Sequence, residues 1–217
     1  MGEYFLPMTL KQHLRKPLPY GEFNVALILI AVNLGVFLIT NVYRDSLTYL
    51  AMNPILVTRR GFVWTIFTYM FAHANLNHLF FNMLGLFFFG TQVERTVGSW
   101  EFLMFYLLTG FLSGLFSLLF FIVSGTNLVF LLGASGAVYG VLFAFAAFYP
   151  DAHVFVFGLI PVKSFILVTL YTFIELFSQL QGRTGVAHLT HLAGFGFAYL
   201  FFLIRYGKNP IREWFGR

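Results

Sequence analysis

Residues 131–140 read LLGASGAVYG, and this stretch contains both a helix-packing pattern and an unexpected polar group. Gly136 and Gly140 form a GxxxG pattern, which in an apolar helix lets the backbone of a second helix approach closely. Ser135 places a hydroxyl group beside that contact, in surroundings that are otherwise apolar. Two questions follow: what kind of helix contains the stretch, and which helix packs against it.

The composition of the chain indicates an integral membrane protein. Of its 217 residues, 59% are hydrophobic and 10% are charged, and the mean hydropathy is +0.81. Soluble domains average about 25% charged residues, so this chain has too few to cover a water-facing surface. The chain contains no cysteine, which excludes disulfides and thiol chemistry. Its basic residues are scattered, which argues against binding to nucleic acid.

Six apolar segments are long enough to be membrane-spanning helices, since about 20 residues cross a bilayer core of roughly 30 Å. All six should be helical, because a membrane span must satisfy its backbone hydrogen bonds internally. The segments are residues 24–42, 75–93, 102–123, 130–150, 161–180 and 187–205. The sequence therefore predicts an all-α polytopic membrane protein, a bundle of six transmembrane helices. One membrane domain is expected over residues 24–206, between cytoplasmic tails at 1–23 and 207–217.

The distribution of Lys and Arg predicts the orientation of the bundle, because cytoplasmic loops are enriched in these residues. With the N-terminus inside, nine basic residues fall on the inner side and four on the outer side. The inner residues are Lys11, Arg15, Lys16, Arg95, Lys163, Arg205, Lys208, Arg212 and Arg217, and the outer ones are Arg44, Arg59, Arg60 and Arg183. Both termini are expected in the cytoplasm, and the expected location is a bacterial inner membrane.

The loop between the first two spans contains a further apolar segment at residues 61–72, GFVWTIFTYMFA. Twelve residues are too few to cross a bilayer. The segment is expected either to lie in or near the outer membrane interface or to pack on the bundle, and these alternatives are compatible.

Polar side chains are predicted at a similar depth in three spans, near the outer ends. They are Ser135 in the fourth span, His188 and His191 in the sixth, and His78 and Asn82 in the second. If residues 127–135 are helical, Ser135 lies at most about 12 Å below the outer loop. Polar groups inside a membrane are costly and usually face the bundle interior, which favours one shared site. Each group could instead have a structural role. The serine could pack as a small residue or bond its own helix backbone, a histidine could lie at the membrane interface, and the asparagine could tie two helices together.

Small residues predict that the fourth and sixth spans pack together. Gly194 and Ala198 form a stripe on the sixth span that matches the GxxxG pattern of the fourth. Such packing would place Ser135 opposite His191, which could then act as the base that a serine nucleophile needs. Tyr139, four residues after Ser135 on the same helix face, could pack against that imidazole and fix its orientation.

An acidic partner for the histidines is not evident. Asp45 and Glu175 are the two acidic residues expected in the outer half, and neither lies in a motif with a histidine. A Ser–His dyad is therefore expected rather than a triad. His78 and Asn82, with the backbone N–H of the serine near a helix N-terminus, could donate hydrogen bonds to a developing oxyanion.

Four motifs resemble, in order along the chain, those of the rhomboid family of intramembrane serine proteases. HANLNHLFFN, residues 73–82, resembles the family's HxxxxHxxxN, and ERTVGS, residues 94–99, resembles the short inner turn after the second span. GASGAVYG, residues 133–140, resembles the GxSG motif with its following tyrosine. HLAG, residues 191–194, resembles the catalytic histidine with its downstream glycine. The resemblance covers about residues 60–200 and implies the minimal six-span bacterial form.

The resemblance also implies the roles of individual residues. Ser135 would be the nucleophile and His191 the base, whereas His188 is a rival base that lacks the glycine three positions later. The implied oxyanion hole comprises His78, Asn82 and the Ser135 amide, Tyr139 would support the base, and the packing glycines would be Gly133, Gly136, Gly140 and Gly194. Single-span membrane proteins would be cut at or near the outer membrane face, without a metal or cofactor and within the lipid bilayer. In the first outer loop, Trp64 is followed by Thr65, whereas the best-known bacterial members have an arginine there. This difference affects how that loop would be anchored and does not affect the Ser–His dyad.

Three alternatives compete with this interpretation. A metal site could use His73, His78, His188 and His191, but the HExxH motif of zinc-dependent proteases is missing. A transporter or channel could use intramembrane histidines as a proton relay, but it would distribute polar groups across the bilayer, and here they gather on one side. A membrane scaffold without catalysis is the third alternative.

Overall fold

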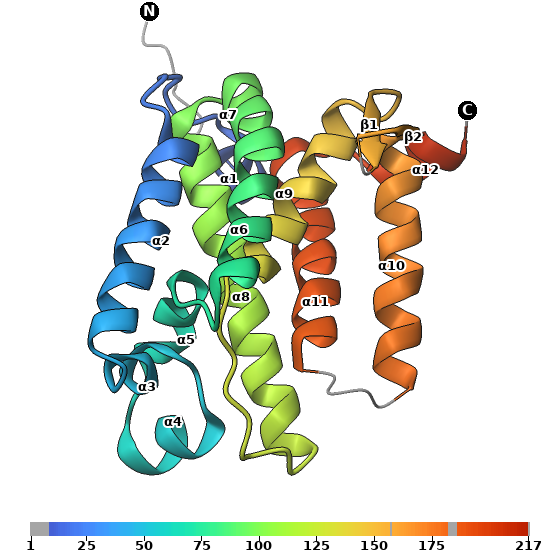
Figure 1. The fold of residues 1–217 in the computed structure, drawn as a ribbon. Helices are drawn as coiled ribbons and strands as arrows, with labels where there is room; N and C mark the ends of the chain where they lie inside the picture. Colours follow the sequence, from blue (N-terminus) through green and yellow to red (C-terminus); the bar gives the residue numbers. More distant parts are fainter. Residues whose placement is uncertain (1–8, 157, 182–185, 217) are drawn as a thin grey trace, which may run out of the picture.

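A computed structural model describes residues 9–156, 158–181 and 186–216, and these form one bundle of roughly aligned helices (Figure 1). The long elements are α2 (Val25–Val42), α6 (Leu76–Gly85), α8 (Ser99–Val123), α9 (Ser135–Phe148), α10 (Ser164–Leu180) and α11 (Val186–Phe201). A π turn, η2 (Leu86–Gly90), joins α6 to α7 (Thr91–Val97), and another, η3 (Phe202–Tyr206), extends α11. Helices therefore occupy all six predicted positions.

Three of these helical segments are long and apolar enough to cross a membrane: Val25–Val42, Ser99–Val123 and Ala187–Tyr206. The apolar helices α9 and α10 are shorter, with 14 and 17 residues. The second predicted span is helical throughout, and the turn at its centre, η2, has π instead of α geometry. Its apolar helices and composition make the chain an integral membrane protein, and the number of six crossings stays a prediction.

The prediction of helix was wrong at the start of the fourth and fifth segments. Residues 130–134 are not helical, and Leu131 exchanges backbone hydrogen bonds of 2.8 and 2.9 Å with Met52. Residues 161–163 belong to an antiparallel hairpin of β1 (His153–Val156) and β2 (Ile160–Lys163), so the described chain is not purely α-helical. Both segments are continuously apolar, and hydropathy alone does not separate an extended chain from a helix.

The extended approach to α9 also changes the expected depth of the serine. An extended residue advances about 3.3 Å, compared with about 1.5 Å in a helix. The limit of about 12 Å assumed a helix over residues 127–135, and no helix is present over 124–134. That limit therefore does not apply, and the chain is long enough for Ser135 to lie deeper in the bundle than it allowed.

The centre of the bundle is formed by α8, α9 and α11, which approach one another through small residues. A β-carbon added at Gly140 would lie 2.5 Å from Cγ2 of Thr109 on α8. A β-carbon added at Gly194 of α11 would overlap the carbonyl oxygen of Gly136 on α9. The close packing predicted between the fourth and sixth helices is therefore present. It requires glycine on both helices, because any larger side chain would push the backbones apart.

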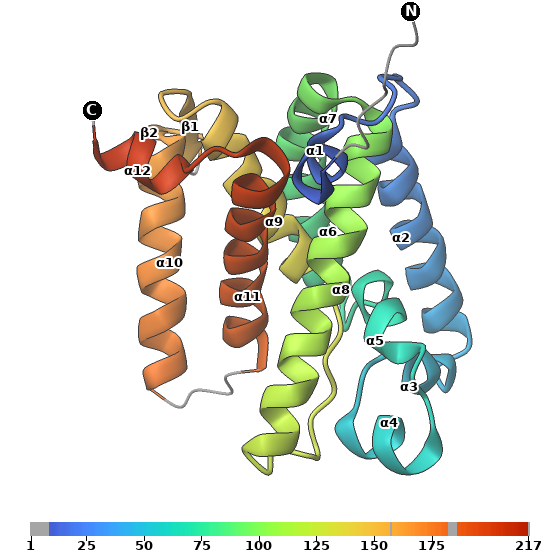
Figure 2. The same ribbon diagram turned by 180° about the vertical axis from the view of Figure 1, so that it is seen from behind.

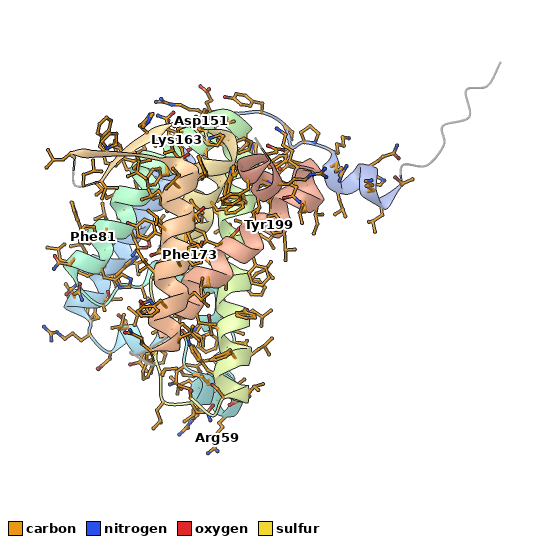
Figure 3. All side chains as sticks on the ribbon, turned by 90° about the vertical axis from the view of Figure 1, so that its right-hand side faces the viewer. Arg59, Phe81, Asp151, Lys163, Phe173 and Tyr199 are labelled. Atoms are coloured by element: carbon orange, nitrogen blue, oxygen red, sulfur yellow. The ribbon has the colours of Figure 1, made fainter. Side chains whose placement is uncertain are left out.

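The short helices of the two tails lie at one end of the bundle, α1 (Leu10–Arg15) beside η3 and α12 (Pro210–Phe215) near α10 (Figures 1 and 2). Trp214 of α12 is buried, and its ring lies 5.2 Å from that of Phe143. Lys163 and Asp151 lie at this end too, whereas Arg59 lies at the opposite end (Figure 3). This separation agrees with the predicted division for the described basic residues. Arg183 and Arg217 lie outside the described residues, and the orientation in the membrane stays a prediction.

The connection from α2 to α6 folds into short helices: α3 (Ser46–Leu50), α4 (Pro54–Arg60), α5 (Thr65–Thr68) and η1 (Tyr69–Phe71). Tyr69 is fully buried and donates a hydrogen bond of 2.7 Å to the carbonyl oxygen of Gly110 on α8. Trp64 is 46% exposed. The apolar segment 61–72 thus packs on the bundle and still presents an aromatic side chain outward, and its place at the membrane interface stays a prediction.

Candidate active site

Ser135 is the first residue of α9 and is half-buried. The first four backbone N–H groups of a helix have no partner inside it, and the helix dipole is positive there. Two residues earlier, Gly133 has a φ of +117°, a conformation that side chains rarely adopt. The turn into α9 therefore presents unpaired N–H groups beside the serine hydroxyl, an arrangement suited to binding negative charge.

Tyr139 connects the helix of the serine with His191. The two rings stack with centroids 4.0 Å apart and planes 12° apart. Ser135 lies four residues before Tyr139, on the same face of α9, so this face of the helix meets α11 at the histidine. In the part of the chain that the structure describes, the Ser135 hydroxyl makes no hydrogen bond with His191. Hydrogen bonds between a nucleophile and its base are in general often long or poorly aligned until substrate binds.

Glu175 on α10 joins this site, although it lies in no sequence motif with a histidine. Its carboxylate oxygen Oε1 lies 3.0 Å from Nδ1 of His191 and accepts a hydrogen bond of 2.5 Å from the Tyr139 hydroxyl. The Glu175 side chain is 6% exposed. The sequence left the histidines without an evident acidic partner, and the structure provides one because α10 packs against α9 and α11 in the folded bundle.

His188, the rival base, contacts the same carboxylate. Its Nδ1 lies 2.5 Å from Oε2 of Glu175. The His188 and His191 rings are 6.4 Å apart and perpendicular, and the Tyr139 ring stacks on His191. The side chain of His188 is 29% exposed and that of His191 14% exposed. His191 is thus the more enclosed of the two and the one held against the helix that begins at Ser135.

The two residues of the expected oxyanion hole lie on α6. The His78 ring lies against the backbone of Gly133, since a β-carbon added at the glycine would be 2.5 Å from its Cε1 and Nε2 atoms. The side-chain amide of Asn82 is buried and donates 2.8 Å to the carbonyl oxygen of His78, four residues earlier. One N–H of that amide remains for another acceptor. In the structure, His78 therefore lies at the turn before the serine, and the Asn82 side chain is hydrogen-bonded to the backbone of its own helix, α6.

His73, the first histidine of the HxxxxHxxxN pattern, lies in the loop before α6 and is buried. The backbone N–H of Ala134 points to its Nε2 at 3.5 Å, and its Nδ1 is buried without a partner among the described residues. Burial and, to a lesser extent, the neighbouring His78 together lower the pKa of His73 to about 4. A neutral ring at this position supports the turn into α9 without adding charge.

Three ligand-type side chains come together at the site. One donor atom each from Glu175, His188 and His191 lies within 4.8 Å of the other two, a spacing that could hold a metal ion. In this structure the carboxylate instead accepts hydrogen bonds from both rings. The metal alternative from the sequence included His73 and His78, and the structure places these two at the turn before Ser135 and not with the acid.

The sequence shows that Glu175 is an unusual residue, but it does not show which side chains Glu175 contacts. An acidic residue inside an otherwise apolar helix is by default a candidate functional residue. Its partners lie 13 and 16 residues later on the next helix and 36 residues earlier. The rotation of α10 against α11 decides that contact, and sequence spacing across an intervening loop does not define this rotation.

The comparisons with known proteins point to one family. The family model described as the rhomboid domain matches residues 60–208, more than half of the chain. The chain is 26% identical over 195 residues to the mitochondrial RHOMBOID-like protein 12 of Arabidopsis thaliana, and 30% identical over 158 residues to the rhomboid protease AarA of Providencia stuartii. It is 28% identical over 120 residues to the rhomboid protease GlpG of Haemophilus influenzae.

These similarities cover different shares of the proteins compared. The similarity covers 80% of this chain for RHOMBOID-like protein 12, 65% for AarA and 55% for GlpG. They include 56%, 56% and 59% of the respective relatives. The chain thus spans little more than half the length of the curated relatives it matches.

Proposed function

Because this membrane protein belongs to the rhomboid family, we propose that it is an intramembrane serine endopeptidase that hydrolyses peptide bonds of single-span membrane proteins. Two of the relatives compared are rhomboid proteases. The observation that carries the proposal is the stacking of Tyr139 on His191, one helical turn from Ser135. It supports a base that is held beside the hydroxyl at the start of α9.

The proposed reaction begins with the transfer of the Ser135 hydroxyl proton to His191. The serine oxygen then attacks the substrate carbonyl carbon and forms a tetrahedral intermediate. The Ser135 amide, His78 and Asn82 are the proposed donors to its oxyanion, and losing one such donor typically costs about 3–4 kcal/mol of transition-state stabilisation. His191 passes the proton to the leaving amine, and water later releases the acyl group by the same steps.

The proposed location of cleavage is the outer membrane face, with both termini in the cytoplasm of a bacterial cell. It is supported by the excess of basic residues at the end of the bundle that contains α1 and α12. The turn before Ser135 follows the loop at the opposite end, after α8 (Figure 2). Hydrolysis consumes water, so we also propose that a water-filled cavity at Ser135 opens toward that end.

The proposal is tested by labelling the purified protein with a fluorophosphonate, which reacts with activated serines. The wild-type protein should be labelled and should cleave a single-span substrate in liposomes, and Ser135→Ala should do neither. Labelling that persists in Ser135→Ala would reject this serine as the nucleophile. A chelator should leave both activities unchanged, and a loss that zinc restores would favour the metal alternative.

A further inference from the structure

We propose that Glu175 is a positioning residue that completes a Ser135–His191–Glu175 triad, so that this chain does not depend on a serine–histidine pair alone. The inference rests on the proposed protease function and adds the acid that orients its base. The geometry that carries it is a buried carboxylate on α10, in contact with side chains of both neighbouring helices.

The carboxylate of Glu175 has hydrogen-bonding partners on both oxygens. Oε1 faces Nδ1 of His191 at 3.0 Å and the Tyr139 hydroxyl at 2.5 Å, and Oε2 faces Nδ1 of His188 at 2.5 Å. An ionised carboxylate accepts hydrogen bonds and cannot donate them. All three partners must then donate, which assigns the proton of the neutral His191 ring to Nδ1.

This assignment defines what His191 can do next. With the proton on Nδ1, Nε2 carries the lone pair and is the atom that can accept the proton of the Ser135 hydroxyl. When the serine oxygen bonds to the substrate carbonyl carbon, that proton moves to Nε2 and the ring becomes an imidazolium. Glu175 remains ionised and stabilises this cation. The same proton then moves to the leaving nitrogen as the C–N bond breaks, and the ring returns to neutral.

A second function of the contact is to hold the ring in one orientation. Tyr139 stacks on one face of the His191 imidazole and donates its hydroxyl proton to the oxygen that the imidazole also contacts. The acid and the tyrosine therefore restrict the same ring by two different interactions. A side chain restricted in this way loses little further freedom when it acts as a base.

A purely structural role for Glu175 is the alternative to be tested. A buried carboxylate is costly in an apolar helix unless donors surround it, and the three donors here offset that cost. The same contacts would tie α10 to α9 and α11 even without catalysis. The two roles differ in the pH dependence of the reaction, because a carboxylate that acts on the base favours its protonated form, whereas one that only ties the helices together would leave that titration unchanged.

Several titratable groups lie near His191 and can also influence its titration in such a pH profile. They are Glu175 from α10, Tyr139 from α9, His188 from α11 itself and His78 from α6. Tyr171 of α10 lies one ring further away, against Tyr139. Glu175 is the acidic group among these side chains. Its neutralisation therefore removes the negative charge nearest to the base, and the other groups stay in place.

The experiment compares Glu175→Gln with the wild-type protein in liposomes, using a single-span substrate and the rate of fluorophosphonate labelling. Glu175→Gln should lower kcat by about 10²-fold or more, since removing the acid of a triad can cost about 10⁴-fold. The acid limb of its pH–rate profile should move to lower pH, because the lost negative charge disfavours the protonated imidazole. Glu213→Gln, at an exposed position on α12, removes the same charge far from the site and should match the wild type.

Thermal unfolding in detergent shows whether each variant folds. If Glu175→Gln does not fold, Glu175→Asp serves in its place: it retains the charge, so its acid limb should stay at the wild-type pH and its kcat should fall by a smaller factor. A folded Glu175→Gln with the wild-type rate and pH profile would overturn the inference and leave the proposed protease intact. A rate loss with an unchanged pH profile would also overturn it, in favour of the structural role. A wild-type protein that neither cleaves nor labels would instead overturn the proposed function.

Discussion

Gly133 sets the surroundings of the candidate nucleophile through its backbone conformation. Its φ of +117° turns the chain into α9, and its N–H donates 2.9 Å to the carbonyl oxygen of Tyr69. The missing side chain leaves room for the imidazole of His78, which would otherwise lie 2.5 Å from a β-carbon. One glycine thus accounts for both the sharp turn and the proximity of a candidate oxyanion donor.

Substitution of this glycine should affect activity more than a comparable glycine elsewhere. Gly133→Ala is expected to displace the His78 ring and to lower kcat by about 10-fold or more, because an oxyanion donor acts only at its proper distance. Gly125→Ala is the control, since Gly125 also has a positive φ, of +73°, but has open space around it. Both variants should lose about 1 kcal/mol or more of stability from backbone strain. Cleavage measured per folded molecule separates the effects, and equal rates in the two variants would contradict the role of the His78 contact.

Among the contacts between helices, the site depends most on the one between α9 and α11. The carbonyl oxygen of Gly136 lies where a β-carbon on Gly194 would be, so the two backbones touch directly. Gly136 directly follows Ser135, and Gly194 lies one helical turn after His191. A change in the spacing of these helices would therefore change the distance between hydroxyl and imidazole.

The two glycines of α11 provide a matched test of this contact. Gly194→Ala should separate α11 from α9, destabilise the protein by about 1–3 kcal/mol and strongly reduce cleavage. Gly196→Ala should leave cleavage unchanged and stability equal or slightly higher, since nothing lies within 4 Å of a β-carbon there and alanine favours the helix. Unfolding in detergent and substrate cleavage are the measurements. An active, stable Gly194→Ala would show that the helices tolerate a wider spacing.

At the scale of the whole molecule, buried carboxylates join distant segments at the end that contains the tails. Glu94 accepts hydrogen bonds of 2.7 and 2.8 Å from the backbone N–H groups of Val25 and Ala26 at the start of α2. Glu101 accepts from Arg205 at 2.5 and 2.6 Å, and Arg205 also donates 2.6 Å to the carbonyl oxygen of Leu14. These bonds connect α8, η3 and the N-terminal segment.

Loss of the buried ion pair should destabilise the whole bundle. Arg205→Met leaves Glu101, with a side chain 4% exposed, without its partner, and breaking such a buried pair typically costs about 3–5 kcal/mol. Lys163→Ala is the control, because its ion pair with Asp151 has side chains 44% and 56% exposed and should contribute at most about 1 kcal/mol. Denaturant unfolding in micelles measures both. A stability of Arg205→Met within 1 kcal/mol of the wild type would contradict this account.

The proposed orientation in the membrane can be tested because the chain has no cysteine. Lys11→Cys on α1 and Arg59→Cys on α4 introduce one thiol each, at exposed positions at opposite ends of the bundle. A membrane-impermeant maleimide added to intact cells should label the cysteine at position 59, and should label the one at position 11 only after permeabilisation. The reverse pattern would invert the proposed topology.

The sequence by itself determined the class of protein, the approximate positions of the helices and the candidate nucleophile. Long apolar segments can satisfy their backbones in a membrane only as helices, so hydropathy was a sufficient guide to the bundle. The motifs around Ser135 and His191 are local, and the GxxxG pattern predicted which helices meet because close approach depends on residue size. The later match of residues 60–208 to the rhomboid domain agrees with the family resemblance of those motifs.

Only the tertiary structure decided three other features. The extended chain over residues 130–134 and the hairpin of β1 and β2 depend on pairing with partners, such as Met52 for Leu131, that apolar composition does not reveal. The third decided feature is the contact of Glu175 with His191, which depends on how α10 is rotated about its axis when it packs. An acidic residue in an apolar helix must find donors to offset its desolvation, but its own sequence does not say which helix provides them.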